Sequence, residues 1–468
     1  MRHVELNLIQ TGQACAIRVA ATGSASCGAL YTIVPMILRD DFLCYNTNVN
    51  LADLLKKSLD SSLLDLIHHI ADESSALGFA IYLVGGSVRD LLLARPIVDL
   101  DLTLEGDAIK LARALVKKHG GDLTTHEKFF TATWTPQSSN SQILDLISAR
   151  RETYSTPGAL PTVTKSTLDD DLRRRDFTIN AMALRVDGDH FGELYDPLNG
   201  QNDIGKKLIR VLHPNSFLDD PTRIFRAIRY AERYGFTIEL ETLKLINDDS
   251  LKVLSGLSGE RLRHEFDLIF EEPNPSKMLK QLADLNILGQ IQPRLQVTSY
   301  ELPFLEVPTS NFGEFAIPDL LSFRQTLGWT LNLMDFTEAD IESLAERLAF
   351  PVLLTKAILS ASKLKKDLPS FKDWNPSQWT FHLDELPSLS IYAVYLVSKE
   401  NVLSEYLAKW QHVKPITTGD DLKARGLEPG PRFGEILRQL RAAWLDGEVE
   451  TKEEEVKLVQ RLLKEGAK

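Results

Sequence analysis

One short segment alternates strictly between apolar and polar residues, which predicts a half-buried strand. The apolar positions are Val98, Leu100, Leu102 and Leu104, and the polar positions between them are Asp99, Asp101 and Thr103. Successive side chains of a strand point to opposite faces, so the two carboxylates share one face. A pair of carboxylates on one face suits a hard divalent cation such as Mg²⁺.

A second apolar strand and a helix start come just before this acidic strand. The run I-Y-L-V ends at Gly85 and Gly86, and the segment from Ser87 has the pattern of a first helical turn. Glycines let backbone N–H groups approach phosphate oxygens, and a helix N-terminus favours anions. Arg89 adds a permanently charged fork. The order of these parts predicts a nucleotide site with a metal.

A third carboxylate is expected from a neighbouring strand. Within the apolar run Q-I-L-D-L-I-S-A-R, residues 142–150, Asp145 is the only acidic residue. We expect it to be buried and to need a partner, and we interpret it as the group that orients or deprotonates an attacking hydroxyl. The alternative is an ordinary aspartate at a strand end.

Arginines gather in two later segments. The first, D-L-R-R-R-D-F-T-I-N-A-M-A-L, contains Arg175, Asp176 and Asn180, whose groups can hydrogen-bond a sugar and its phosphates. The second, residues 217–236, predicts a helix with Asp220 as N-cap and Gly235 at its end. Arginines recur along it at spacings of three and four, on one broad face, at Arg223, Arg226, Arg229 and Arg233.

G-G-S-V-R-D followed by D-L-D, together with the two arginine segments, resembles the class II tRNA nucleotidyltransferase (CCA-adding enzyme) and bacterial poly(A) polymerase family. The resemblance implies that Asp99, Asp101 and Asp145 are catalytic and that Asp99 and Asp101 bind metal. It also implies that Asp220 and Arg223 pair with the incoming base. The nucleotide-binding residues implied are Gly85, Gly86, Arg89, Arg175, Asp176, Asn180, Asp220, Arg223, Arg226 and Arg229.

Two features bear on how many nucleotides such an enzyme adds. Asp219 stands where the family carries the leading glutamate of its Glu-Asp-x-x-Arg motif, and this leaves the number open. Residues 151–170, rich in Pro, Gly, Ser and Thr, show no sustained periodicity and predict a loop long enough for a flap. In the resembling enzymes a flexible loop at this place helps the switch from cytosine to adenine addition.

The resemblance implies an α+β protein with a nucleotidyltransferase head, a mixed sheet with helices, followed by an all-α neck, body and tail. In the helix from Leu257 to Phe270, we interpret Arg261 as a salt-bridging neck residue. In the tail, Lys423, Arg425 and Arg432 either meet tRNA phosphates or simply solvate a surface turn. The expected units are residues 1–55 (an extension), 56–204 (head), 205–272 (neck), 273–350 (body) and 351–468 (tail).

Composition limits the setting. The 468 residues are 43% hydrophobic and 25% charged, which is typical of a globular chain, and no stretch approaches a membrane span. All three cysteines lie in the first fifty residues, which fits a reducing, cytoplasmic location. Those residues lack periodicity, so we expect them to be disordered or translated from an upstream start, with Met36 as the alternative to Met1.

The resemblance implies template-independent addition of CMP and AMP, as CCA, to the 3′ end of tRNA from CTP and ATP with Mg²⁺. The alternatives are an A-adding specialist, a poly(A) polymerase and a non-catalytic RNA-binding relative. The net charge of −12 and the acidic segment at residues 448–456 favour a fixed tRNA-shaped substrate over promiscuous RNA binding. The oligomeric state is left open.

Overall fold

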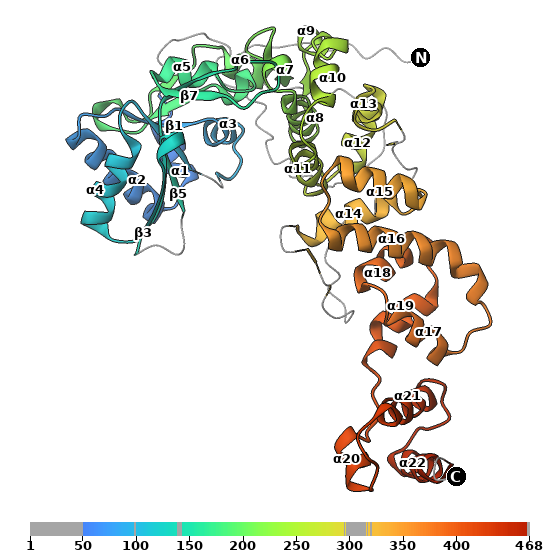
Figure 1. Ribbon diagram of the computed structural model, residues 1–468. Helices are drawn as coiled ribbons and strands as arrows, with labels where there is room; N and C mark the ends of the chain where they lie inside the picture. The colour runs from blue at the N-terminus through green and yellow to red at the C-terminus, as the bar shows by residue number, and fades with distance from the viewer. Residues whose placement is uncertain are drawn as a thin grey trace, which may run out of the picture. The chain divides into compact units, whose positions relative to one another are not determined.

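The computed structural model describes residues 50–97, 100–137, 143–293, 295, 315, 317–318 and 321–465 (Figure 1). All of them belong to one unit, Asn48–Lys468. Most of the expected extension, including Met36, lies outside the described residues. Its last six residues are structured, because Asn50 forms a β-bridge with Glu193 and helix α1 (Ala52–Ser58) follows at once.

The head contains a seven-stranded sheet in the order β3-β4-β5-β2-β1-β8-β9. Strands β2 and β5 are parallel and the other neighbours are antiparallel, so the sheet is mixed as predicted. The strands are β1 (Ile81–Val84), β2 (Asp101–Leu104), β3 (Asp122–His126), β4 (Thr131–Thr135), β5 (Leu144–Ser148), β8 (Ala183–Arg185) and β9 (Leu194–Tyr195). Of the predicted acidic strand, Val98 and Asp99 lie outside the described residues, and the strand itself begins at Asp101, after Leu100.

Helices α1, α2 (Ser61–Ala76) and α4 (Ala108–His119) pack their apolar residues against one face of this sheet. Ala132 and Trp134 of β4 are fully buried there, and the three threonines that alternate with them are only half-buried. The same alternation in β5 buries Leu144 and Leu146. The opposite face of these strands is therefore polar, and it carries Asp145.

The predicted loop at residues 151–170 was wrong in part. Strands β6 (Arg150–Thr153) and β7 (Thr162–Lys165) pair as an antiparallel hairpin, and only residues 154–161 between them form a loop. Each strand has four residues, which is too short for an alternating pattern to stand out among Pro, Gly, Ser and Thr. Helix α5 (Leu168–Arg173) and the 3₁₀ turn η2 (Thr178–Asn180) complete the head.

The rest of the described chain is helical, which confirms the α+β class. The predicted arginine helix divides into α7 (Ser216–Asp219) and α8 (Thr222–Tyr234), with Pro221 rather than Asp220 at the N-cap. One pair of short strands and further helices complete this part: α6 (Gly200–Gly205), β10 (Leu208–Ile209), β11 (Thr237–Ile238), α9 (Leu240–Lys244), α10 (Asp248–Ser255), α11 (Gly259–Phe270), α12 (Pro275–Asp284), α13 (Ile287–Ile291), α14 (Phe323–Leu333), α15 (Glu338–Arg347), α16 (Val352–Asp367), α17 (Pro376–Leu383), α18 (Ser388–Ser398) and α19 (Asn401–Ala408).

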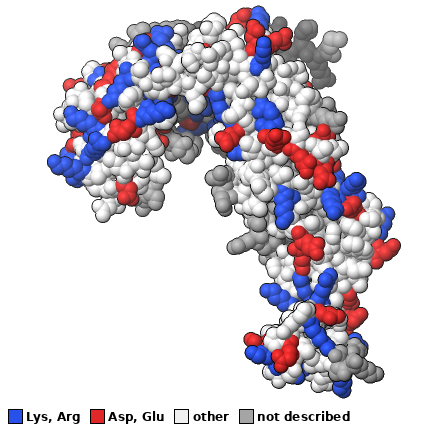
Figure 2. Space-filling view, viewed as in Figure 1, with Lys and Arg blue, Asp and Glu red and all other residues white. Residues whose placement is uncertain are grey.

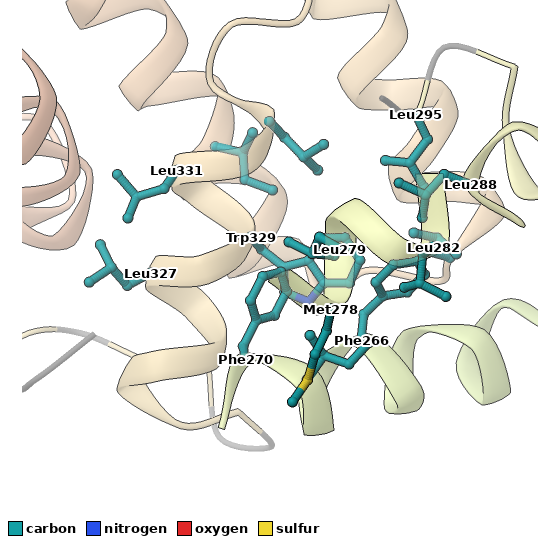
Figure 3. Close-up of a cluster of buried hydrophobic side chains, with 14 of the residues drawn as sticks. Phe266, Phe270, Met278, Leu279, Leu282, Leu288, Leu295, Leu327, Trp329 and Leu331 are labelled. Carbon is teal, nitrogen blue, oxygen red and sulfur yellow. The ribbon is translucent and has the colours of Figure 1, made fainter. Parts of the chain in front are cut away.

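Neck and body share one apolar core. Phe266 and Phe270 of α11 pack against Trp329 of α14, the first ring tilted and the second edge-on, with Met278 and Leu279 of α12 beside them (Figure 3). This core runs without a break across the expected boundaries at residues 272 and 350. Leu422, Ile436, Leu440 and Val459 form a separate small core among α20 (Gly419–Ala424), α21 (Pro431–Leu445) and α22 (Lys452–Glu465). We propose that the tail, as a packing unit, begins near residue 415.

No helix among the described residues is both long and apolar enough to cross a membrane.

Candidate active site

Two of the three predicted catalytic carboxylates lie side by side on the polar face of the sheet. Asp101 is the first residue of β2, and its partner in the parallel ladder is Asp145 of β5. Neighbouring strands are about 4.8 Å apart and paired residues point to the same face. Asp99 lies outside the described residues. Two carboxylates in register on an open face are donors that fit a hard divalent cation.

Asp145 is exposed, so the expectation that it would be buried was wrong. Its neighbours Leu144 and Leu146 take up the packed face, and alternation turns the carboxylate to the polar one. The hydroxyl of Thr133, on the adjacent strand β4, donates a hydrogen bond to Asp145 Oδ1 at 2.7 Å. The carboxylate therefore has a partner, although burial does not demand one.

The glycine turn makes room for an arginine. Gly85 has φ +68° and ψ −125°, a backbone conformation that residues other than glycine rarely adopt. A Cβ there would lie 2.5 Å from Nη1 of Arg175. Gly86, the first residue of helix α3 (Gly86–Leu92), has ordinary helical geometry. The turn thus lets the Arg175 guanidinium lie directly over the backbone at the start of α3.

Arg89 is held by protein groups. Its Nε and Nη2 donate to Asp90 at 3.0 and 2.8 Å, and its Nη1 donates to Asn180 Oδ1 at 2.6 Å. Its guanidinium lies over the ring of Tyr234, 4.6 Å from the centroid, and its side chain is only 6% exposed. In this arrangement Arg89 orients Asn180 and packs α3 against the neck.

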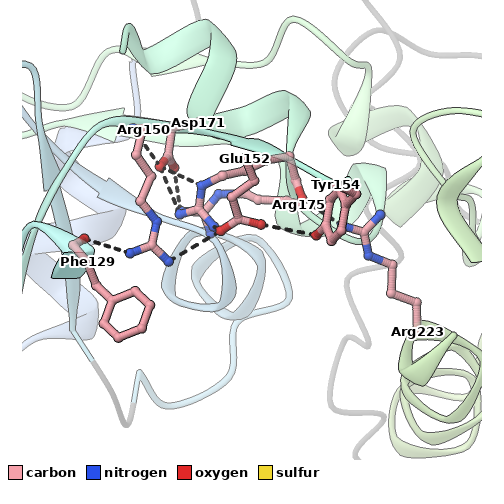
Figure 4. Close-up of polar contacts among 8 residues, drawn as sticks. Phe129, Arg150, Glu152, Tyr154, Asp171, Arg175 and Arg223 are labelled. Carbon is pink, nitrogen blue, oxygen red and sulfur yellow. Dashed lines mark hydrogen bonds and ion pairs between the residues drawn. The ribbon is translucent and has the colours of Figure 1, made fainter. Parts of the chain in front are cut away.

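A buried carboxylate supports the arginine run. Asp171 accepts hydrogen bonds from Arg174 at 2.8 and 2.9 Å and from Arg175 at 3.0 Å. Burial opposes ionisation of Asp171, but the two guanidiniums outweigh it and lower its pKa. Glu152, on the hairpin, accepts from Arg174 at 3.0 Å and from Tyr154 at 3.2 Å (Figure 4). Burial, helped by the charge of Glu152, raises the pKa of Tyr154 to about 12, so its phenol keeps its proton.

Asp176 joins the head to the neck. Its Oδ1 accepts from Asn180 at 2.9 Å, and its Oδ2 accepts from Nε of Arg226, on α8, at 2.8 Å. Burial raises the pKa of the Asp176 carboxyl. The charge of Arg226 and these hydrogen bonds lower it by more than burial raises it, so the pKa lies below its ordinary value. Both oxygens are therefore occupied by protein donors.

The two residues implied to pair with the base are also anchored. Arg223 donates to the hydroxyl of Ser216 and to the carbonyl of Arg174, both at 2.8 Å. Asp220 Oδ1 accepts from the hydroxyl of Thr222 at 2.7 Å and from Arg261 at 2.9 Å. Among the residues that the structure describes, the hydrogen bonds to Asp220 all use Oδ1, which leaves Oδ2 for a ligand.

Arg261 connects the hairpin loop to Asp220. Its Nη2 binds Asp220, and its Nη1 donates to the carbonyl of Gly158 at 2.7 Å. The N–H of Gly158 in turn donates to the carbonyl of Leu218 at 2.9 Å. Arg261 is therefore a salt-bridging neck residue, as predicted. Its partners, the loop and Asp220, could not be predicted, because both lie far from Arg261 along the chain.

These residues surround a cavity of about 650 Å³, a size suited to a nucleotide. Nine of the residues predicted from sequence line it, namely Gly86, Arg89, Asp101, Arg175, Asp176, Asn180, Asp220, Arg223 and Arg226. Other lining residues with polar groups were not assigned to a nucleotide site from the sequence, namely Ser87, Asp90, Glu152, Tyr154, Arg174, Thr222, Tyr230 and Arg233. Six of them lie within the motif segments quoted above, and only Glu152 and Tyr154 come from outside those segments and reach the cavity through the hairpin.

Arg229 lies elsewhere, and we no longer count it among the nucleotide-binding residues. Its side chain is buried in ion pairs with Glu265, at 3.0 Å, and Glu272, at 3.5 Å. The helical spacing placed it correctly on α8, but α11 covers that part of the helix. Burial raises the pKa of the Glu265 carboxyl despite the nearby charge of Arg229.

The predicted RNA-binding residues of the tail lie on either side of the turn between α20 and α21. Lys423 and Arg425 are exposed, and Arg432 donates to the carbonyl of Leu462 at 3.0 Å. Figure 2 shows basic and acidic side chains interspersed over the visible face, including the tail. The geometry leaves Lys423 and Arg425 accessible to a phosphate backbone and gives Arg432 a role in joining two tail helices.

Two family descriptions and several relatives match this chain. Residues 81–210 match the family described as Poly A polymerase head domain, and residues 235–298 match the one described as Probable RNA and SrmB- binding site of polymerase A. An A-adding tRNA nucleotidyltransferase of Halalkalibacterium halodurans is 32% identical over 86% of this chain and 94% of its own length. A CC-adding tRNA nucleotidyltransferase of Deinococcus radiodurans is 30% identical over 80% of this chain and 87% of its own.

Solved structures are similar over most of the chain. The apo form II of a CCA-adding enzyme has a TM-score of 0.74 and 30% identity, covering 88% of this chain and 99% of that one. A Thermotoga maritima CCA-adding enzyme complexed with tRNA has a TM-score of 0.70 and 28% identity, covering 89% and 99%.

We predict that Gly85→Ala destabilises the head. A Cβ at this φ and ψ is strained and collides with Arg175, so the free energy of unfolding should fall by about 1–3 kcal/mol in urea denaturation. Gly86→Ala is the matched control, because Gly86 lies in the helix and its new Cβ would lie 3.3 Å from Nη2 of Arg89, against 2.5 Å from Arg175 at Gly85. Equal stability of the two variants would contradict the strain argument.

We also predict that Arg261→Lys loosens the hairpin loop. A lysine cannot bind Gly158 and Asp220 through two separate nitrogens, so chymotrypsin should cleave after Tyr154 or Leu160 several-fold faster than in the wild type. Leu160 is already 77% exposed and offers a cleavage point. The control is Arg263→Lys, on the same helix, whose arginine binds the carbonyl of Ala349 instead. Equal cleavage rates in both variants would show that Arg261 does not hold the loop.

Proposed function

Because the chain belongs to the tRNA nucleotidyltransferase family, and is an enzyme of that class, we propose that it transfers AMP from ATP to the 3′ end of tRNA that already ends in CC. The A-adding relative supports this choice, since the similarity extends over nearly its whole length. The observation that carries the chemistry is the position of Asp101, which lines the same cavity as the arginines and Asp220.

In the proposed reaction the terminal 3′-hydroxyl oxygen attacks the α-phosphorus, the bond to pyrophosphate breaks, and Asp145 takes the hydroxyl proton. Arg174 and Arg175 line the cavity as fixed cations that can hold the phosphates. Asp220, with one oxygen held by Arg261, can accept a hydrogen bond from the amino group of the base. A divalent cation, which we propose is Mg²⁺ held by Asp99 and Asp101, would stabilise charge developing on the phosphates when bound.

Addition of all three nucleotides, CCA, is the second candidate function, and it is the one expected from the amino-acid sequence. The hairpin and its loop favour it over CC addition alone, because the loop is tethered to Asp220 through Arg261. Asp219 in place of the family's leading glutamate leaves the number of added nucleotides open. A poly(A) polymerase shares the head, and its product would differ in length.

We predict that purified enzyme with ATP and Mg²⁺ adds one AMP to tRNA ending in CC. The measurement uses labelled CTP and ATP, singly and together, on tRNA ending at the discriminator base, in C or in CC. Addition of CCA to the shortest tRNA would replace the first proposal by the second, and long adenylate tracts would indicate a poly(A) polymerase. No incorporation with any substrate would overturn both.

We predict that Asp101→Asn abolishes incorporation and leaves the fold intact. Removing one carboxylate charge from a metal site should lower the rate by a factor of about 10³ or more. Circular dichroism and thermal unfolding verify the fold. Activity within a few-fold of the wild type would exclude Asp101 from the reaction.

A further inference from the structure

Thr133 lies at the centre of β4, directly across the ladder from Asp145. Asp145 is in turn the ladder partner of Asp101, so the three residues form a row across neighbouring strands on the polar face. The Thr133 hydroxyl donates to Asp145 Oδ1 at 2.7 Å. This is a short, well-formed hydrogen bond to a carboxylate.

The hydrogen bond matters because Asp145 is exposed. An exposed carboxylate rotates among several orientations, and it loses this rotational entropy when it must adopt one orientation to react. A carboxylate that a hydrogen bond already holds in that orientation does not lose this entropy during the reaction. Threonine is stiff at χ1 because it branches at Cβ, and its backbone is fixed on both sides by β3 and β5. Thr133 thus holds one oxygen of Asp145 and leaves the other for a substrate hydroxyl.

We propose that Thr133 is the positioning residue that aims Asp145 at the 3′-hydroxyl of the RNA. The inference rests on the proposed function, because it takes Asp145 as the acceptor of the hydroxyl proton. Thr133 itself touches no reacting atom. Its effect reaches the reaction only through Asp145, which predicts a loss in rate without a loss in nucleotide binding.

Threonine is common on half-exposed strands for reasons of packing alone, and β4 provides a test of that explanation. Thr131 has the same residue type, strand and face as Thr133, and it is also half-buried. Its ladder partner on β5 is Ile147 instead of a carboxylate. A role in strand packing would make the two threonines equivalent, whereas a role in positioning singles out Thr133.

The first experiment compares Thr133→Val, Thr133→Ser and Thr131→Val in the incorporation assay, with thermal unfolding as the check on folding. Valine keeps the shape and removes the hydroxyl, so kcat should fall about tenfold, the effect of losing one hydrogen bond to a charged group. KM for ATP should stay within about twofold. Thr133→Ser should restore kcat, and Thr131→Val should match the wild type.

The second experiment repeats Thr133→Val in an Asp145→Asn background. If Thr133 acts through the carboxylate, the second substitution should add little to the loss already caused by Asp145→Asn. Full additivity, failure of serine to restore kcat, or an equal loss in Thr131→Val would overturn the proposal. So would wild-type activity of Asp145→Asn, while the AMP transfer proposed above would stand. An inactive wild type would instead overturn that function and this role together.

Discussion

The ion pair between the buried carboxylate of Asp176 and the partly exposed Arg226 is the contact on which the arrangement of the cavity depends. Asp176 belongs to the head and Arg226 to α8, so the pair fixes the neck helix against the sheet that carries Asp101. A buried carboxylate is costly unless it is fully paired, and loss of its partner would leave that cost uncompensated. The pair continues through Asn180 to Arg89 and Asp90, which hold α3 and the glycine turn. Three structural elements thus meet through one chain of charged and polar groups.

The arginines of the cavity are likewise held by partners within the protein. Each of them must stay charged in a partly enclosed space, and the protein supplies a carboxylate or carbonyl for most of them. Asp171 and Glu152 hold Arg174, and the carbonyl of Arg174 holds Arg223. A guanidinium has five donors, so these contacts fix its position and leave donors for a ligand. The cations are then already in place before a triphosphate arrives, which lowers the cost of ordering them.

The sequence predicted well whatever depended on local periodicity or on short motifs. The strand that begins at Asp101, the glycine turn and the arginine helix all lie where their patterns placed them. It failed where a second element decides the outcome. Spacing put Arg229 on the arginine face of α8, but only the packing of α11 shows that its partners are Glu265 and Glu272. Asp145 was expected to be buried because its neighbours are apolar, yet alternation sends it to the open face. Whether that face is covered is a property of the whole sheet.

Arg261 shows why long-range contacts escape such reasoning and what they allow. It reaches the hairpin loop through the carbonyl of Gly158, and Gly158 donates its own N–H to Leu218. Both contacts use backbone atoms, so they depend on the path of the loop and place little demand on its side chains. The other nitrogen of Arg261 binds Asp220. A change in the path of the loop would therefore alter the support of Asp220, even though Arg261 contacts the loop through a backbone carbonyl. If Asp220 faces the base as proposed, loop conformation and base selection are linked through one guanidinium.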